Sequence, residues 1–322
     1  MSFKVKLAKW IMNLLPAQPE YDILHPRSET INHKSFIETN EENKEKILFA
    51  MAQSHYLEDQ RKPFDSYFLG YDLKKLLAGK KVLDLGCWCG GKSVSYAERW
   101  NVKSMAGIDI NEYFIKAARL FSRQRENKNI EYDFEVGFSE ALPYEDKSFD
   151  AIVTWDVLEH VKSVRDTLKE CKRVLKPGGM LFFIFPSYYC PMNGQHLDFV
   201  TRMPCLNWVF SSQTLNLAYD EIIQSRGEEA YWYKSKANET ADWQKLHGGI
   251  GVNGTTFRGF KAITKEVGFT QINILPTPIF SVGDLSIHYP WIKYLAKTLK
   301  PLLKIEALQD YLSHRIVSIL VV

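Results

Sequence analysis

Long hydrophobic runs are missing from this sequence. Across its 322 residues no uninterrupted apolar stretch reaches the roughly 18 residues that a membrane-spanning helix requires, so no such helix is predicted. Cysteine is scarce, and an odd number of scattered thiols does not suit a disulfide framework, which favours a reducing, cytoplasmic compartment. No metal site is predicted, because Cys87 and Cys89 lack a second group of ligands at zinc-site spacing. The cysteines are Cys87, Cys89, Cys171, Cys190 and Cys205.

A strong net charge is absent as well. The 41 lysines and arginines nearly balance 38 acidic residues, leaving a net charge of +3, so no nucleic acid is expected as a partner. Basic and apolar residues are mixed in the segment 4–16, which predicts a short amphipathic helix rather than a secretory signal. That helix either lies weakly on a membrane surface or, as we favour, packs on its own domain. The sequence leaves the oligomeric state open.

Short apolar runs alternate with helical patterns along most of the chain. Runs that end at glycine or polar residues suit buried strands, and apolar residues every three to four positions suit helices. This alternation predicts a parallel sheet covered by helices on both faces. We expect strands at 81–86, 104–110, 130–138, 149–155, 180–186, 269–275 and 315–322, and helices at 44–56, 66–77, 90–100, 112–125, 161–175 and 255–267.

The same alternation of strand and helix patterns divides the chain into four segments. Residues 1–78 form an N-terminal arm and helical cap, and residues 79–186 hold the most regular alternation. Residues 187–254 are an aromatic-rich insertion without a long period, which suits either a surface for sugars or flat organic acceptors or a small second core. Residues 255–322 complete the sheet, with an inserted segment at 279–312 that we expect to carry its own helices.

The first strand ends in a glycine-rich turn, at 82–91. Glycines let the backbone turn tightly and approach a ligand at the start of the following helix. A nicotinamide cofactor would place a pyrophosphate there, and Asp84 would repel it. The aspartate instead suits a ligand with a cationic amino group, such as the methionine end of S-adenosylmethionine. The alternative is a structural turn with a surface aspartate.

A second carboxylate ends the next strand. Asp109 lies 23 residues after Gly86, where a carboxylate accepts hydrogen bonds from both ribose hydroxyls of an adenosine. Taken alone, Asp109 could equally cap the helix that follows. Together with Asp84 and the glycine turn, it favours an adenosine-bearing ligand.

With these residues in place, the stretch 81–186 resembles the class I S-adenosylmethionine-dependent methyltransferases, particularly the broad family with small-molecule and ubiquinone-type enzymes. The resemblance implies S-adenosylmethionine as cofactor and an α/β fold. That fold is a Rossmann-like, doubly wound, mostly parallel seven-stranded sheet with an N-terminal helical cap and insertions after strand 5 and between strands 6 and 7. The matching motifs, in the family's order, are Val82–Gly91, Gly107–Asn111, Glu140–Asp150, Leu158–His160 and Arg173–Gly179.

The resemblance also implies roles for individual residues. The methionine moiety would be cradled by the first turn, the ribose and adenine by the end of the second strand and by the third, and the rest of the cofactor by the end of the fourth. In that order the residues are Asp84, Gly86, Cys87 and Gly90; Asp109 and Ile110; Phe138 and Ser139; Trp155 and Asp156.

Two residues depart from the family pattern. Trp88 stands where the family usually has glycine, so the turn must widen or the indole must point away from the cofactor. Phe138 replaces an aspartate that often receives the adenine amino group, so adenine recognition would rest on stacking and on the Ser139 backbone.

Methyl transfer to a hydroxyl also needs a group that removes its proton. His196, after the fifth strand, is our first candidate because imidazole titrates near neutrality, and His160, after the fourth, is the second. Each histidine could instead be a hydrogen-bonded surface or loop residue. Further candidates are Glu159, Tyr188, Tyr189 and Asp198. No carboxylate pair has the spacing of a Mg²⁺ site.

These observations predict a methyltransferase that O-methylates a sugar, a glycan precursor or another small polar acceptor. A weaker likeness of the C-terminal tail to methyltransferases of bacterial surface-polysaccharide pathways favours the glycan. Two alternatives stay open: a methyltransferase for a quinone-like or lipid acceptor, which the basic N-terminal segment would serve, and a protein that binds the cofactor or another adenosine ligand without turnover.

Overall fold

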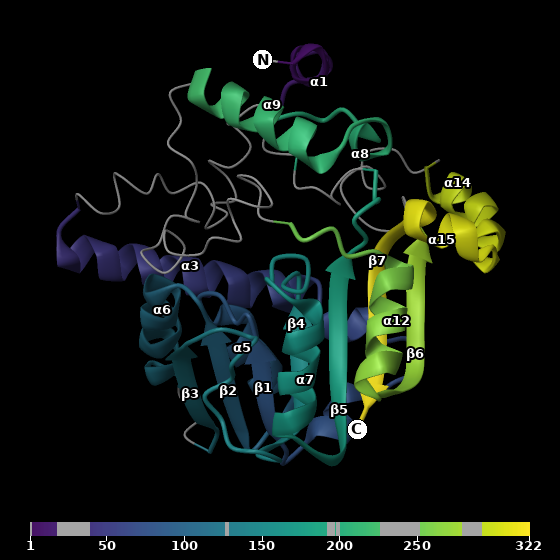
Figure 1. The fold of residues 1–322 in the computed structure, drawn as a ribbon. Helices are drawn as coiled ribbons and strands as arrows, with labels where there is room; N and C mark the ends of the chain where they lie inside the picture. Colours follow the sequence, from purple (N-terminus) through teal and green to yellow (C-terminus); the bar gives the residue numbers. More distant parts are fainter. Residues whose placement is uncertain are drawn as a thin grey trace.

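A seven-stranded sheet in the order β3-β2-β1-β4-β5-β7-β6 forms the centre of the protein (Figure 1). The strands from β1 to β5 pair in parallel, and β7 lies antiparallel between β5 and β6, which confirms the mostly parallel α/β sheet. The structure, a computed structural model, describes residues 2–17, 39–125, 129–191, 197, 200–225, 252–278 and 292–322. The strands are β1 (Lys81–Leu85), β2 (Ser104–Asp109), β3 (Glu131–Val136), β4 (Phe149–Trp155), β5 (Leu175–Pro186), β6 (Thr270–Pro278) and β7 (Ser313–Val321).

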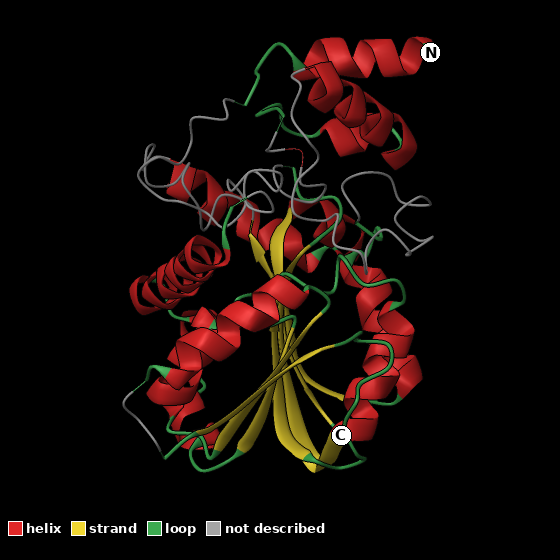
Figure 2. Ribbon diagram, turned by 90° about the vertical axis from the view of Figure 1, so that its left-hand side faces the viewer, coloured by secondary structure: helices red, strands yellow, loops and turns green. Residues whose placement is uncertain are grey.

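Helices cover both faces of the sheet (Figure 2). Side chains alternate along a strand, so Phe183 and Phe185 of β5 pack towards α7 and α12, while Phe182 and Ile184 pack towards η3, α4 and α5. The described helices are α1 (Phe3–Met12), α3 (Glu41–Arg61), the 3₁₀ turn η3 (Phe64–Tyr67), α4 (Leu73–Leu77), α5 (Gly91–Trp100), α6 (Glu112–Arg123), α7 (Val164–Val174), α8 (Leu206–Val209), α9 (Ser212–Ser225), α12 (Phe257–Val267), α14 (Ile292–Leu299), the 3₁₀ turn η5 (Lys300–Lys304) and α15 (Glu306–Leu312).

The carboxyl ends of the parallel strands form the edge of the sheet at which we expect the site. The strand order reverses between β1 and β4, and in open α/β sheets ligands bind beyond the carboxyl ends of the strands at such a point. Helix α3 runs along this edge and packs on α5 and α6 (Figure 1). The N-terminal helical cap therefore borders the site.

Two expectations about the surrounding segments need correction. The helix expected over 66–77 is divided into η3 and α4, because Gly70 adopts a left-handed φ of +90° between them. The insertion at 187–254 contains the regular helix α9, whose apolar stripe packs on α1. The N-terminal amphipathic helix therefore does pack on its own chain, through Val5, Ala8 and Met12. The expected helices within 279–312 are present as α14 and α15.

Within the described residues, no helix combines the length and the apolar character needed to cross a membrane. All five cysteines are free thiols.

Candidate cofactor and acceptor site

Asp84 is a buried carboxylate near the carboxyl end of β1. Its side chain is 5% exposed, and its Oδ2 accepts a hydrogen bond of 2.5 Å from the Ser93 hydroxyl on α5. Burial raises the pKa of Asp84 to about 7, and Ser93 and Lys92 offset only part of that rise. The pKa is raised because a carboxylate out of water is costly without a cationic partner. A ligand ammonium group would supply that partner.

The glycine-rich turn is packed tightly against its surroundings. The backbone N–H groups of Gly86 and Cys87 both donate to the Ile108 carbonyl, at 2.8 and 2.9 Å, which fastens the turn to β2. A Cβ on Gly86 would lie 2.2 Å from Val157 Cγ2, and one on Gly90 would lie 2.4 Å from Ala118 Cβ. Both glycines also have positive φ, so they are required for close approach as well as for turning.

Asp109 ends β2 beside this turn and is half-buried. Its carboxylate accepts hydrogen bonds from the backbone N–H of Trp88 at 3.1 Å and of Asn111 at 2.9 Å. Burial raises the pKa of Asp109 to about 6, although these bonds oppose the rise. The cap of α6 is Asn111, whose side chain accepts from the Tyr113 N–H, so capping does not account for Asp109. Asp84 and Asp109 thus lie on neighbouring strands at the same edge.

Trp88 stands where the family usually has glycine, and its indole packs against other side chains of the protein. It adopts a left-handed φ of +52°, which a glycine would take without strain. Its ring stacks on Phe114 of α6, with centroids 4.2 Å apart, and on His55 of α3 at 6.1 Å. Burial lowers the pKa of His55 to about 4, so that imidazole is neutral near pH 7.

The residues assigned to adenine differ in exposure. Phe138 is 48% exposed, so its ring is available for stacking. The Ser139 hydroxyl is bonded within the protein, to Thr167 and Glu140, each at 3.0 Å. Ile110 is half-buried beside Asp109, and the Cys87 thiol is buried with its pKa raised by burial, so it stays protonated. The roles of these residues stay predictions.

Trp155 ends β4 and Asp156 follows it, close to the switch point between β1 and β4. Asp156 adopts a left-handed φ of +55°, and its N–H donates to the Ile184 carbonyl of β5 at 2.8 Å. Its carboxylate accepts a hydrogen bond from Nη1 of Arg315, near the start of β7. The Lys92 ammonium lies 4.4 Å from the Trp155 ring centroid. Strained backbone of this kind is often found at functional sites.

The candidate bases differ in their surroundings, and two of them lie outside the described residues. His160 is partly buried, with Nε2 3.9 Å from Oε1 of the buried Glu159. Tyr188 bonds to Ser212 within the insertion through its hydroxyl, and the Tyr189 ring stacks on Tyr311 of α15, with centroids 4.8 Å apart. His196 and Asp198 lie outside the described residues. No three potential metal ligands gather in the part of the chain that the structure describes.

Some residues of the site escaped sequence reasoning. Ser93 and Lys92 contact Asp84 and Trp155 from the first turn of α5, and their position directly after the glycine turn was the available signal. Arg315 and Tyr67 both lie beside the Trp155 ring although they are far from each other and from Trp155 in the sequence. No local pattern marks either residue.

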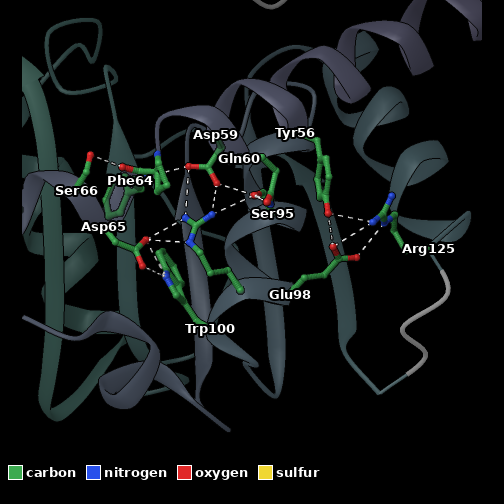
Figure 3. Close-up of polar contacts among 12 residues, drawn as sticks. Tyr56, Asp59, Gln60, Phe64, Asp65, Ser66, Ser95, Glu98, Trp100 and Arg125 are labelled. Atoms are coloured by element: carbon green, nitrogen blue, oxygen red, sulfur yellow. Dashed lines mark hydrogen bonds and ion pairs between the residues drawn. The ribbon is translucent and has the colours of Figure 1, made fainter.

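A polar network anchors the N-terminal cap beside the site (Figure 3). The fully buried Asp59 carboxylate accepts hydrogen bonds from Ser95 at 2.6 Å and Arg99 at 2.5 Å, both on α5, and from the Phe64 N–H at 3.0 Å. About one turn earlier in α3, the Tyr56 hydroxyl donates to Glu98 at 2.8 Å. The network ties α3 and η3 to α5, which carries Lys92 and Ser93.

The strand order, with the antiparallel β7 between β5 and β6, gives a doubly wound, Rossmann-like sheet, and acidic residues lie at the carboxyl ends of β1 and β2. Residues 83–183, about a third of the chain, match the family described as "Methyltransferase domain". Ubiquinone biosynthesis O-methyltransferase of Acinetobacter baylyi is 36% identical over 107 residues, which cover 33% of this chain and 44% of that protein. The protein of that name from Thiobacillus denitrificans is 36% identical over 114 residues, covering 35% and 47%.

This chain therefore spans less than half the length of these curated relatives, and neither their activity nor their acceptor follows for it from a match of that extent. A solved S-adenosylmethionine dependent methyltransferase from Mesorhizobium loti is similar at 15% identity, with a TM-score of 0.45 over 78% of this chain and 95% of that one. That likeness is too distant to bear on function.

Proposed function

We propose that the protein transfers a methyl group from S-adenosylmethionine to an oxygen of a sugar, a glycan precursor or another small polar acceptor. Asp84 carries this proposal, because its burial beside a glycine turn favours a cationic ligand group and disfavours a pyrophosphate. Asp109 supports it from the next strand, with a half-buried carboxylate placed for ribose hydroxyls. These groups fit the amino acid and ribose ends of the cofactor.

The chain itself binds and orients the reactants. S-adenosylmethionine supplies the electrophilic methyl group when bound. Asp84 would hold the ammonium group and Asp109 the ribose, with Phe138 stacking on the adenine. The acceptor would enter past Trp155, where its hydroxyl loses a proton to a nearby base, for which His196 remains our first candidate and His160 the second.

Calorimetric titration with S-adenosylmethionine, S-adenosylhomocysteine and NAD tests the binding part. We expect both sulfur nucleosides to bind and Asp109→Ala to weaken them at least tenfold, or about 1.4 kcal/mol. Asp133→Ala, an exposed aspartate on the neighbouring β3, is the matched control and should change nothing. A change below twofold for Asp109→Ala would refute the ribose assignment.

A turnover assay then separates catalysis from binding. Radioactive methyl groups from S-adenosylmethionine should enter hydroxyl-bearing compounds of a metabolite extract. If binding is tight but no compound in any extract fraction is labelled, the protein is a cofactor-binding protein without turnover.

A second candidate is a lipid-like acceptor, such as a quinone precursor, met at a membrane surface. Helix α1 packs on α9 by one face and leaves Phe3 77% and Trp10 60% exposed on another, with Leu14 51% exposed just beyond its end. The exposed Lys4 and Lys6 lie on the same helix. Exposed aromatic residues combined with lysines suit the surface of an anionic membrane.

Sedimentation with phosphatidylcholine vesicles, with and without phosphatidylglycerol, tests this candidate. Binding should need the anionic lipid and fall at least fivefold in Phe3→Ser/Trp10→Ser. Leu69→Ser, which changes a residue that is 85% exposed in the cap, is the control. Equal binding by the double variant, or no binding to anionic vesicles, would eliminate the membrane-surface candidate.

A further inference from the structure

Arg315 uses only part of its hydrogen-bonding capacity within the described residues. Its side chain is only 15% exposed, and Nη1 donates to Asp156. Among the described residues, nothing accepts a hydrogen bond from its other guanidinium N–H groups. A guanidinium has five N–H donors, and no Arg315 nitrogen is a fully buried atom without a partner, so the donors that Asp156 leaves are within reach of a ligand.

The unused donors have a definite geometry. Asp156 accepts from Nη1, and the planar guanidinium also carries an Nε–H and an Nη2–H that point in parallel from one edge. Two parallel N–H groups match the two oxygens of a carboxylate or a phosphate. Asp156 fixes the guanidinium from one end and leaves this edge for a ligand.

Two aromatic side chains complete the surroundings of Arg315. The Trp155 ring centroid lies 6.0 Å from the guanidinium carbon, and the Tyr67 ring meets Trp155 edge-on at 5.3 Å. The Tyr67 hydroxyl is buried, and no described residue serves as its hydrogen-bond partner. One more donor is therefore unused beside the same indole.

The charges around Arg315 nearly balance one another. Asp156 balances Arg315, and Glu58 balances Lys92 at 3.4 Å. Lys62 lies over the Tyr67 ring, with its ammonium 5.5 Å from the centroid, and no described carboxylate pairs with it. The buried Glu159 also acts on Arg315 electrostatically, so this group of residues beside β4 and β7 carries no net surplus of charge, and the donors of Arg315 rather than the local charge argue for an anion.

We propose that Arg315, Tyr67 and Trp155 form an acceptor subsite that binds a carboxylate or phosphate group of the methyl acceptor. The acceptor role rests on the proposed methyl transfer, whereas anion binding by these side chains does not depend on it. Arg315 receives the anion at its Nε and Nη2 edge, the Tyr67 hydroxyl donates to a further oxygen, and the Trp155 ring forms the wall.

Calorimetric titration with inorganic pyrophosphate and with benzoate, at constant ionic strength, tests the subsite. These probes distinguish a phosphate-bearing from a carboxylate-bearing acceptor, and each is titrated with and without saturating S-adenosylhomocysteine. We expect at least one probe to bind the full chain, with affinity at least tenfold weaker in Arg315→Gln. Arg315→Lys, which keeps the charge but loses the paired donors, should also weaken binding at least tenfold.

Matched variants keep the result interpretable. Arg165→Gln removes a surface arginine that pairs with Glu266 at 2.7 Å, and it should leave probe affinity within twofold. Tyr67→Phe retains the ring on Trp155 and should weaken the probe about threefold or more. A denaturant melt of each variant reports an intact fold, so Arg315→Lys and Tyr67→Phe decide the matter if Arg315→Gln does not fold.

The outcomes separate the subsite from the proposed function. Wild-type affinity in both Arg315→Lys and Tyr67→Phe, an equal loss in Arg165→Gln, or no binding of either probe at about 10 mM would overturn the subsite, even with S-adenosylhomocysteine bound normally. Anion binding that depends on Arg315, in a protein that ignores S-adenosylhomocysteine, would instead support the subsite and refute the methyl transfer.

Discussion

The affinity for S-adenosylhomocysteine should fall at acidic pH through Asp84. Only the ionised carboxylate attracts the ligand ammonium, and burial raises the pKa of Asp84 to about 7. With that pKa, the ionised fraction drops from about three quarters at pH 7.5 to about one tenth at pH 6. We therefore expect affinity to fall about eightfold over this range, or about 1.2 kcal/mol. Asp109, with a pKa of about 6, adds at most about twofold.

Calorimetry in buffers of different ionisation enthalpy measures both the affinity and the protons exchanged. At pH 6 the wild-type protein should release nearly one proton from Asp84 on binding. Asp84→Asn should bind at least tenfold more weakly at pH 7.5 and change by no more than about twofold down to pH 6. A wild-type affinity that varies less than twofold, or a variant with the wild-type pH profile, would refute the assignment of the ammonium to Asp84.

The same carboxylate has an effect on stability with the opposite sign. Because the folded pKa of Asp84 is raised, the folded chain binds more protons than the unfolded chain between about pH 4 and pH 7. Stability without ligand should therefore decrease as pH rises through that window, with the full penalty above pH 7. Three pKa units set an upper limit of about 4 kcal/mol. Asp84→Asn should remove much of this penalty in denaturant melts at pH 8.

Three further predictions concern the turn, the cap and the base. Gly86→Ala places a Cβ 2.2 Å from Val157 Cγ2 at a φ of +75°, so unfolding free energy should fall by about 2–4 kcal/mol, with partial recovery in the double variant with Val157→Ala. Asp59→Ala leaves its arginine partner partly buried and should cost about 3 kcal/mol in the same denaturant melts. His196→Ala should slow turnover about a hundredfold with S-adenosylhomocysteine affinity unchanged, and His160→Ala should slow it less. An unchanged rate would exclude His196 as the base.

The sheet was predictable because each strand has an apolar pattern that can be recognised in its own sequence. β4 and β5 are apolar on both faces, as buried parallel strands must be, and the expected bounds of β4 match at both ends. The start of β5 was placed too late, at Met180, because Pro177 and two glycines predict a turn, although Leu175 already pairs with Phe149. Long-range pairing decided a boundary that the local pattern could not.

The residues of the candidate site also differ in whether a local sequence pattern marks them. Asp84 and Asp109 were accessible to sequence reasoning because each follows a strand and accompanies a glycine motif within a few residues. Arg315 was not, because it bonds to Asp156 across 159 residues and only the insertion of β7 beside β5 brings the two together. Tyr67 escaped for a similar reason, since it reaches the site only after Gly70 breaks the expected helix.

Trp88 shows how a departure from the family pattern is accommodated in physical terms. A left-handed backbone costs a tryptophan about 1–2 kcal/mol more than glycine, and stacking on Phe114 and His55 can return about 0.5–1.5 kcal/mol for each ring pair. The backbone N–H of the same residue holds Asp109. Because His55 belongs to α3, the stack joins the N-terminal cap to the carboxylate proposed to hold the ribose. Replacing this tryptophan should therefore change both the packing of the cap and the position of the Asp109 carboxylate. A glycine at the same position would satisfy the backbone of the turn but would not pack on the cap.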